Sequence, residues 1–273
     1  FTQITGTQHA VALSSGTAAL QLALHAHGIR SGDEVIIPPL CLPPVAAAVT
    51  ATGAQPVFAD IDAYTYTISP DDVSRVITER TRAVLAVHLF GQPCEMDRLA
   101  AVAEEHGLTL IEVVWEALGA RYHDRRVGTH GTACYSFQDG MSIIAGEGGI
   151  LTTDDENVAK MVRCMANFGC DGNGRIQQPG YNYLMTELTA AVALSQLPRV
   201  DSYARLQEYW AMELTHELKE WDGLITPAVR PGARHAFQRY AVRVCPEFPM
   251  TPSDVCRKLA SLDIEASCNP VVP

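Results

Sequence analysis

The feature that most constrains the fold is an alternation, from about residue 10 to residue 155, of short apolar runs with longer segments of helical periodicity. Short β-branched runs predict strands buried on both faces, and the segments between them predict crossover helices. Together they predict an α/β architecture with a mostly parallel seven-stranded sheet and helices on both faces. The expected strands are VALS (11–14), EVIIP (34–38), QPVFADI (55–61), AVLAVHL (83–89), LTLIEVV (108–114), ACYSF (133–137) and GILTT (149–153).

Residues 16–28 and 95–107 place apolar side chains at i, i+3, i+4 and i+7 and then stop at a glycine, as amphipathic helices do. Residues 155–169 repeat the pattern after an acidic start. A longer helical segment, 186–221, is interrupted at Pro198, which cannot donate a backbone hydrogen bond. These segments complete a large domain that we expect to span residues 1–224.

After a Pro/Gly-rich crossing at 225–236, the sequence changes to an alternating run at 237–244, which predicts a strand, and a capped helical segment at 251–263. We expect residues 225–273 to be the start of a smaller C-terminal α+β domain. Both chain ends are abrupt, so we expect the sequence to be the ordered part of a longer protein.

The composition excludes several classes of function. Twenty basic against 31 acidic residues give a net charge of -11, which repels nucleic acid and anionic membrane. Eight cysteines lie far apart without a CxxC pair, so neither a metal site nor a disulfide framework is expected. No apolar run is long enough to span a membrane, and no secretion signal opens the chain. We therefore expect a cytoplasmic protein that acts on a small molecule.

One helix start has the features of an anion site. Ser15, Gly16 and Thr17 open the first long helical segment directly after an expected strand. Ligands of open α/β sheets bind at the carboxyl ends of strands, and a helix N-terminus offers backbone N–H groups to phosphate. A Ser-Gly-Thr sequence before a helix is also a common N-cap, so the motif alone leaves both roles open.

Seven segments, taken together, are more specific. In order and spacing they resemble the DegT/StrS-type sugar aminotransferases, and they are most similar to the 3-amino-5-hydroxybenzoate synthases among them. The resemblance covers nearly the whole chain. It rests on SSGTAAL (14–20), GDEVIIPPL (32–40), GAQPVFADID (53–62), VHLFGQP (87–93), GARYHDRRVGTHG (119–131), SFQDGMSIIAGEGG (136–149) and NYLMTELTAAVALSQL (182–197).

The resemblance implies a fold-type-I architecture of pyridoxal-phosphate (PLP) enzymes, an obligate dimer, and nucleotide-sugar or cyclitol chemistry in polysaccharide or antibiotic biosynthesis. It also implies a phosphate cup, formed here by Ser15, Gly16, Thr17 and Ser136. Asn182 corresponds to an asparagine that reaches this cup from the neighbouring subunit. The same residues also suit caps and turns that are kept only for folding.

The part of the family's site that holds the cofactor ring differs in this sequence. The residues that match it, Leu42, Val113, Trp115 and Met141, are called the ring pocket below. Val113 replaces the aspartate that keeps the pyridine nitrogen protonated, and Trp115 replaces a small residue beneath the ring. Leu42 stands for the stacking aromatic residue, and outside the pocket Leu184 replaces an arginine. The resemblance thus predicts a pocket filled by side chains.

Met141 occupies the position of the lysine that binds PLP. A thioether forms no Schiff base and offers no base for proton transfer, so the family's transamination chemistry has no side chain here. Relatives that dehydrate sugars carry histidine at this position and keep the ring aspartate, whereas this chain lacks both. We therefore expect no PLP cofactor, with PLP use as the alternative.

Two residues near the pocket are catalytic candidates. Glu116 takes the place of a glutamine or histidine beside the cofactor, and in a dry pocket it suits acid–base work. It also suits an ion pair with an arginine such as Arg121 or Arg125. Cys41 lies in a strand-end loop and suits a nucleophile only if its pKa is lowered. A small core residue is the other interpretation of Cys41.

Three functions remain open from the sequence. The first is a PLP-independent, repurposed enzyme of natural-product biosynthesis with a phosphate- or nucleotide-bearing substrate, acting as a homodimer. The second is a catalytically inactive subunit that forms a heterodimer with an active paralogue. The third is a PLP-dependent DegT/StrS-type aminotransferase.

Overall fold

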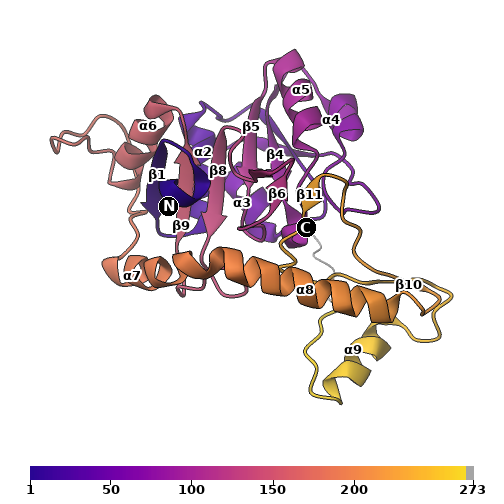
Figure 1. The fold of residues 1–273 in the computed structure, drawn as a ribbon. Coiled ribbons are helices and arrows are strands. Elements are labelled where there is room, and N and C mark those ends of the chain that lie inside the picture. The colour runs from indigo at the N-terminus through magenta and orange to yellow at the C-terminus, as the bar shows by residue number, and fades with distance from the viewer. Residues whose placement is uncertain (269–273) are drawn as a thin grey trace.

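The structure is a computed structural model of the chain and describes residues 1–268. Its centre is the expected seven-stranded sheet, in the order β1-β9-β8-β5-β4-β2-β3 (Figure 1). Only β9 runs antiparallel to its neighbours, so the prediction of a mostly parallel sheet is confirmed. The strands are β1 (His9–Leu13), β2 (Glu34–Ile37), β3 (Gln55–Phe58), β4 (Thr81–Val87), β5 (Thr109–Val113), β8 (Thr132–Ser136) and β9 (Gly149–Thr153).

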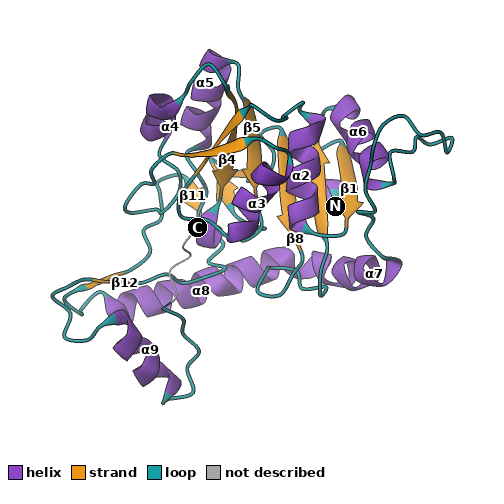
Figure 2. Ribbon diagram, turned by 180° about the vertical axis from the view of Figure 1, so that it is seen from behind, coloured by secondary structure: helices purple, strands orange, loops and turns teal. Residues whose placement is uncertain are grey.

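Helices cover both faces of this sheet, as Figures 1 and 2 show. One face packs against α2 (Gly16–Ala26), α3 (Pro43–Ala51) and α6 (Glu156–Ala166), and the other against α4 (Pro70–Val76) and α5 (Met96–His106). Three of these, α2, α5 and α6, are the amphipathic helices expected from the sequence. The sequence interpretation did not include α3 or α4, and both begin at prolines in the first turn.

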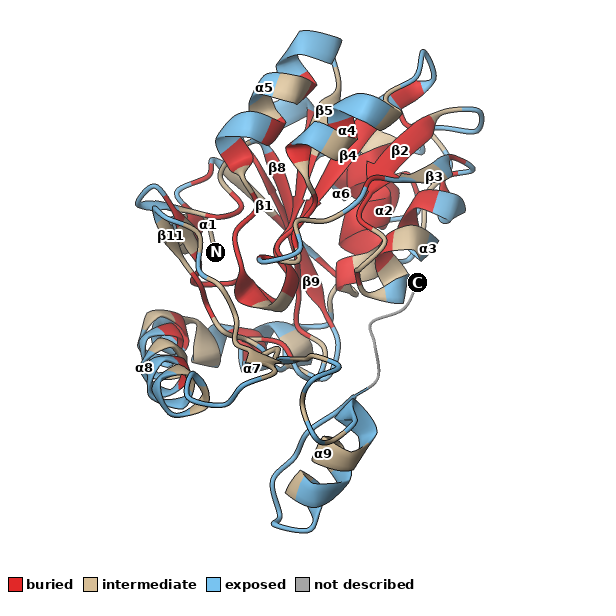
Figure 3. Cartoon of the chain, turned by 90° about the vertical axis from the view of Figure 1, so that its right-hand side faces the viewer, coloured by how far each residue is buried: buried red, intermediate tan, exposed pale blue. Residues whose placement is uncertain are grey.

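The two faces have separate hydrophobic cores because side chains alternate along each strand. In β4, Leu85 and Val87 belong to the core under α2, while Val84 and Ala86 belong to the core under α5. Figure 3 shows the buried residues concentrated in the sheet and the helices beside it. The core under α2 is the one that continues into the ring pocket.

Further elements connect the sheet to the C-terminal region. The helical segment at 186–221 is interrupted where expected, because Pro198 lies in the 3-10 turn η2 (Leu197–Arg199) between α7 (Glu187–Gln196) and α8 (Val200–Leu218). The other short elements are α1 (Thr2–Thr5), η1 (Leu89–Gly91), β6 (Arg121–Tyr122), β7 (Arg125–Arg126) and β11 (Ala233–Arg234). No helix within residues 1–268 is long and apolar enough to cross a membrane.

The C-terminal region contains a two-stranded sheet of β10 (Leu224–Ile225) and β12 (Arg243–Val244), followed by α9 (Pro252–Ala260). Thr251 caps α9 as expected, by accepting a hydrogen bond from the Asp254 N–H. The division into domains 1–224 and 225–273 stays a prediction, and its last five residues lie outside the described part of the chain. Within that part, β11 returns to pair with β6 of the large domain.

The prediction of a strand over residues 237–244 is wrong except for its last two residues. The preceding backbone docks on the loop after β4 instead. The Ala236 N–H donates to the Gly91 carbonyl at 2.9 Å and the Arg239 N–H to the Phe90 carbonyl at 3.2 Å. Phe237 between them has a φ of 48°, which no strand residue adopts. This docking brings Gln238 to the loop that carries Met141 and Arg239 to Glu116.

Candidate functional site

The phosphate cup is built on the N-terminus of α2. Ser15 is extended, and its hydroxyl accepts a hydrogen bond from the Ala18 N–H at 3.0 Å. Its carbonyl accepts another from the Ala19 N–H, also at 3.0 Å. Gly16 and Thr17 supply the first two N–H groups of the helix, which no α-helix satisfies internally. The expected cap and helix start are thus both present.

Two residues from neighbouring strands meet Gly16. Ser136 is the last residue of β8, and Trp115 follows the end of β5. A Cβ built on Gly16 would lie 3.0 Å from the Ser136 Oγ and 3.0 Å from the Trp115 Nε1. Trp115 is 4% exposed, and its buried Nε1–H has no hydrogen-bond partner within residues 1–268. The glycine is required here because a Cβ would lie only 2.6 Å from the Ser136 Cβ, which is too close for two carbon atoms.

The ring pocket is packed as part of the hydrophobic core. Val113, Trp115 and Met141 are each at least 96% buried and belong to the same cluster, against which the partly buried Leu42 packs. The free volume left beside them is about 10 Å³, roughly the space that one water needs. Its lining consists of Leu42, Val45, Val87, His88, Leu89, Val113, Trp115 and Glu116.

Glu116 forms an ion pair, but with neither of the arginines considered from the sequence. Its carboxylate accepts from the Arg239 Nε at 2.6 Å and from the Phe90 N–H at 2.9 Å. Arg121 and Arg125 instead donate to the carbonyls of Asp124 and Thr129. Glu116 is thus buried with both oxygens occupied, while the Arg239 side chain is 46% exposed.

Cys41 lies in the core and does not have the properties of a nucleophile. The residue is fully buried in the cluster that contains Trp115 and Met141. Burial raises the pKa of its thiol to about 11, the opposite of the lowered pKa that a nucleophilic role requires. These are the properties of a small core residue and do not support the predicted catalytic role of Cys41.

The loop that carries Met141 is held in place by a residue that the sequence interpretation missed. Gln238 accepts from the Ser142 hydroxyl at 2.7 Å and donates to the Gly140 carbonyl at 2.9 Å. Gln238 is 96 positions from Ser142, so no local sequence pattern predicts the contact. The polar residues at 238 and 239 in an expected half-buried strand were the only available signal.

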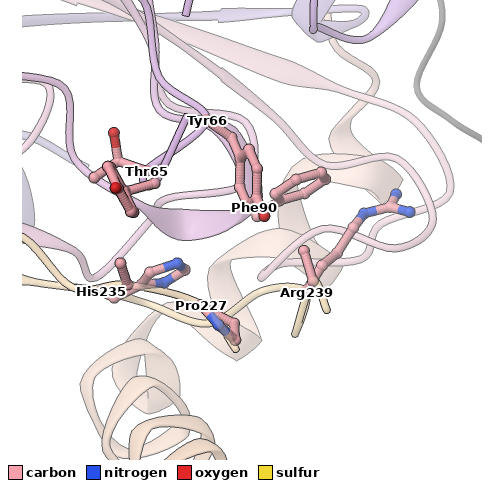
Figure 4. A pocket seen from close by; sticks show the side chains of 9 residues that line it. Thr65, Tyr66, Phe90, Pro227, His235 and Arg239 are labelled. Atoms are coloured by element: carbon pink, nitrogen blue, oxygen red, sulfur yellow. The ribbon is translucent and has the colours of Figure 1, made fainter. Parts of the chain in front are cut away.

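A small cavity lies beside the Glu116–Arg239 ion pair, and Figure 4 shows the side chains around it. Its volume is about 10 Å³, and Tyr66, Phe90 and His235 contribute to its lining. The Arg239 guanidinium points away from it (Figure 4). Tyr66 and Phe90 adopt the left-handed backbone region, with φ of 60° and 58°. Burial lowers the pKa of His235 to about 3, so this imidazole is neutral at pH 7.

A buried charged cluster supports β5 from behind the site. His88 and Glu112 are both fully buried, and the His88 Nε2 lies 3.0 Å from a Glu112 oxygen. The His88 Nδ1 accepts from the Cys94 N–H. Burial raises the pKa of Glu112, but hydrogen bonds from His130, His88 and the Gly128 N–H outweigh it and hold the pKa below the usual range. The cluster ties β5 to the loop after β4 and to the turn before β8.

Asn182 and Leu184 lie on the molecular surface. Their extended segment runs beside the end of β1, where the Ser14 N–H donates to the Tyr183 carbonyl at 2.8 Å. Both residues are exposed, and Leu184 retains 48% of its surface. The role of Asn182 at a neighbouring subunit's cup stays a prediction.

The surface beside them carries many large apolar side chains along α7 and α8, called the apolar strip below. Leu188 is 82% exposed and Trp210 is 61% exposed. Figure 1 shows the two helices end to end beneath the sheet. The strip comprises Leu188, Val192, Leu194, Tyr203, Leu206, Tyr209, Trp210, Met212 and Leu214.

Comparison with known sequences identifies relatives of this arrangement. The sequence model of the "DegT/DnrJ/EryC1/StrS aminotransferase family" matches residues 1–269. The spore coat polysaccharide biosynthesis protein SpsC of Bacillus subtilis is 41% identical over 257 residues, which cover 89% of this chain and 66% of SpsC. The GDP-perosamine synthase of Caulobacter vibrioides is 39% identical over 270 residues, covering 97% and 73%. The chain thus spans about two thirds to three quarters of these relatives' length.

Solved structures give the same grouping. DesV of S. venezuelae, in complex with a ketimine intermediate, superposes with a TM-score of 0.93 at 34% identity, covering 97% of this chain and 70% of DesV. A 3-amino-5-hydroxybenzoic acid synthase superposes with a TM-score of 0.84 at 31% identity, covering 87% and 64%. The expected fold-type-I architecture is therefore confirmed.

Proposed function

The chain belongs to the DegT/DnrJ/EryC1/StrS aminotransferase family, and we propose that it is a member that does not use PLP and serves as the non-transaminating subunit beside an active relative. The family is one of sugar aminotransferases in natural-product and sugar biosynthesis. The observation that carries the proposal is the packed ring pocket, in which Val113, Trp115 and Met141 belong to the hydrophobic core.

The residues of the ring pocket do not fit the PLP ring. Ligand pockets in proteins measure about 300–1,000 Å³, whereas the space here is about 10 Å³. Met141 provides no amine, and Val113 provides no carboxylate for a pyridine nitrogen. Admitting the ring requires moving the Trp115 indole, which is packed in the core. The same lack of space argues against a substrate in this position.

The apolar strip supports a partner of the same fold. Monomers rarely expose apolar patches of more than a few hundred Å², and this one runs along two successive helices. It continues to the segment of Asn182, which is exposed beside the end of β1. A second family member seated on the strip covers its apolar side chains and receives Asn182 at its own cup.

Co-expression with an active paralogue from the same genome tests the proposal. We expect the two chains to co-purify and the mixed assembly to transaminate faster than the paralogue alone, while this chain alone neither binds PLP nor turns over. Leu188→Glu places a charge in the apolar strip and should weaken the association at least tenfold. Leu262→Glu, at a 57% exposed site outside the strip, is the control.

Bound PLP that survives dialysis of the chain alone, seen as visible absorbance, would contradict the proposal. So would a purified paralogue whose activity does not change when this chain is added.

A repurposed, PLP-independent enzyme remains the second candidate because of one observation. Arg239 pairs with Glu116 at 2.6 Å, and its guanidinium side chain is 46% exposed, so an anionic substrate group can approach it. Glu116 stays a candidate acid–base residue in this second proposal only. Turnover of a pathway intermediate by the isolated chain, lost in Glu116→Gln, would favour this function over the first.

A further inference from the structure

We propose that Cys256 and Cys268 form a reversible disulfide that fastens residues 264–268 to helix α9, by exchange with low-molecular-weight disulfides such as oxidised glutathione. Both thiols are free in this structure. The inference does not depend on the proposed function, because α9 lies outside the sheet that holds the ring pocket (Figure 1). The two cysteines are far apart in the sequence, and the fold is what brings them together.

The first argument is the path of the chain after α9. Asp263 adopts the left-handed backbone region, with a φ of 58°. The Ile264 N–H donates to the Leu259 carbonyl at 3.0 Å, and the Asp263 N–H donates to the Ala260 carbonyl at 3.1 Å. These two bonds around a left-handed residue form a Schellman motif, which ends a helix and turns the chain back. Residues 264–268 therefore return along α9, as both ribbon views show (Figures 1 and 2).

The second argument is the place that the returning segment reaches. The Cys268 Sγ lies 3.8 Å from the Oγ of Ser253, a residue in the first turn of α9. Ser253 and Cys256 have the i, i+3 spacing of helix neighbours, so their side chains share one face of α9. The Cys256 thiol interacts with Cys268 directly, because desolvation and then this neighbour raise the pKa of Cys256. The fold therefore brings the two thiols together on one face of the helix.

The third argument is the weak support of α9 by the rest of the chain. None of its nine residues, all of which the structure describes, is buried. A helix of this length is marginal in water without tertiary packing. A bond from Cys256 to Cys268 closes a loop through the C-terminal part of α9, which restricts the conformations of the unfolded segment. The disulfide therefore stabilises α9, and reduction leaves the helix weakly held.

The reaction is a thiol–disulfide exchange. Cys268 is exposed and Cys256 is half-buried, so Cys268 makes the first attack. Its thiolate attacks one sulfur of the small disulfide, whose S–S bond breaks and releases a thiolate that takes up a proton. Cys256 then loses its proton to solvent and attacks the Cys268 sulfur, which releases the second small thiol. The two cysteines together lose two hydrogen atoms, and the small disulfide is reduced to two thiols.

Peptide mapping of the full chain tests the proposal. The protein is equilibrated with a mixture of reduced and oxidised glutathione, and the remaining free thiols are alkylated. Trypsin then cuts after Arg257 and Lys258, which separates the two cysteines. We expect peptides 244–257 and 259–273 to stay linked, with a mass two hydrogen atoms below their sum. The linked fraction should not change when the protein is diluted, because the bond forms within one chain.

Three serine variants make the mapping specific. Cys256→Ser and Cys268→Ser should each abolish the link. Cys245→Ser is the matched control and should keep it, because Cys245 is half-buried like Cys256 and lies in the same tryptic peptide. Loss of the link in Cys245→Ser overturns the inference. So does recovery of Cys256 and Cys268 only as alkylated thiols or as separate glutathione adducts.

Limited trypsin digestion of the native wild type gives a readout that needs no variant to fold. Cleavage after Lys258 requires local opening of α9, so the oxidised protein should be cut about tenfold more slowly there than the reduced protein. Cys245→Ser should show the same difference, and Cys256→Ser should show none. Equal cleavage rates in the oxidised and the reduced wild type overturn the inference that the disulfide fastens the segment to α9.

Discussion

The phosphate cup and the ring pocket adjoin at Trp115, yet their chemistry is opposite. The cup consists of backbone N–H groups and small hydroxyls at the start of α2. The ring pocket consists of apolar side chains in the core under the same helix. A helix keeps its preference for anions whatever its neighbours are, whereas a ring site exists only through particular side chains. The cup therefore depends mainly on the backbone of α2, whereas the ring pocket depends on which side chains line it.

The largest expected effect concerns the packing of the ring pocket. Trp115→Ala removes a buried indole and should lower the free energy of unfolding by about 3–5 kcal/mol, measured by denaturant titration. Trp210→Ala, at a site that is 61% exposed, is the control and should cost far less. If Trp115→Ala costs under about 1 kcal/mol, the indole does not stabilise the core. The ring pocket would then not differ from the cup in the way described above.

The second prediction restores the family's amine. Met141→Lys puts an ammonium group into a cluster with Val113 and Trp115, and its burial should cost about 2–4 kcal/mol of stability. Borohydride reduction with PLP, followed by mass spectrometry, should find no adduct at position 141. Met161→Lys on α6, at a 38% exposed site, should leave stability within about 0.5 kcal/mol. Transamination by Met141→Lys alone would show that the pocket is open.

The third prediction separates the two regions by pH. His235 lines the small cavity beside the Glu116–Arg239 ion pair, and burial lowers its pKa from 6.5 to about 3. Below pH 6.5 the His235 imidazole is protonated in the unfolded chain but stays neutral in the folded chain. The free energy of unfolding therefore falls as the pH falls. From pH 7 to pH 5 the loss due to His235 should be about 2 kcal/mol, measured as the difference between wild type and His235→Asn.

The cup behaves differently with pH. The residues of the cup do not titrate in this range, so the stability that they contribute should not change with pH. If wild type and His235→Asn lose the same stability between pH 7 and pH 5, His235 does not cause the acid sensitivity.

The smallest expected effect is at the cap of α2. Ser15→Ala removes the acceptor for the Ala18 N–H and should cost about 1 kcal/mol of stability, measured by denaturant titration. Ser69→Ala removes the equivalent cap of α4, where the hydroxyl accepts from the Asp72 N–H at 3.3 Å, and should cost a similar amount. Unchanged stability in Ser15→Ala would show that this hydroxyl does not stabilise the start of α2.

Much of the fold and part of the site were predictable from local patterns. The seven apolar runs became the seven strands, because strands buried on both faces need continuous apolar sequence. The helix start at Ser15 followed from its capping side chain. The prediction of a strand at 237–244 was wrong except for its last two residues. Its alternating side chains suit a strand, but the backbone N–H groups of Ala236 and Arg239 bond to Gly91 and Phe90.

The partner of Glu116 was not predictable. Arg121 and Arg125 are near it in sequence, but Arg239 reaches it across 123 positions. Such a contact depends on how the C-terminal segment docks, and the pattern of apolar residues in the sequence does not predict this docking. The same holds for Gln238, which fixes the Met141 loop.

The sequence by itself determined where the seven strands of the sheet lie, because strands buried on both faces need continuous apolar runs. It also determined that position 141 carries no amine and position 113 no carboxylate, because these depend on residue identity alone. Tertiary structure decided that Val113, Trp115 and Met141 pack into one core and that the Trp115 Nε1 lies beside Gly16. Side-chain direction is set by contacts between segments distant in the chain. The sequence therefore shows that residue 115 is a tryptophan, but only the tertiary structure shows that its indole N–H is buried without a hydrogen-bond partner within residues 1–268.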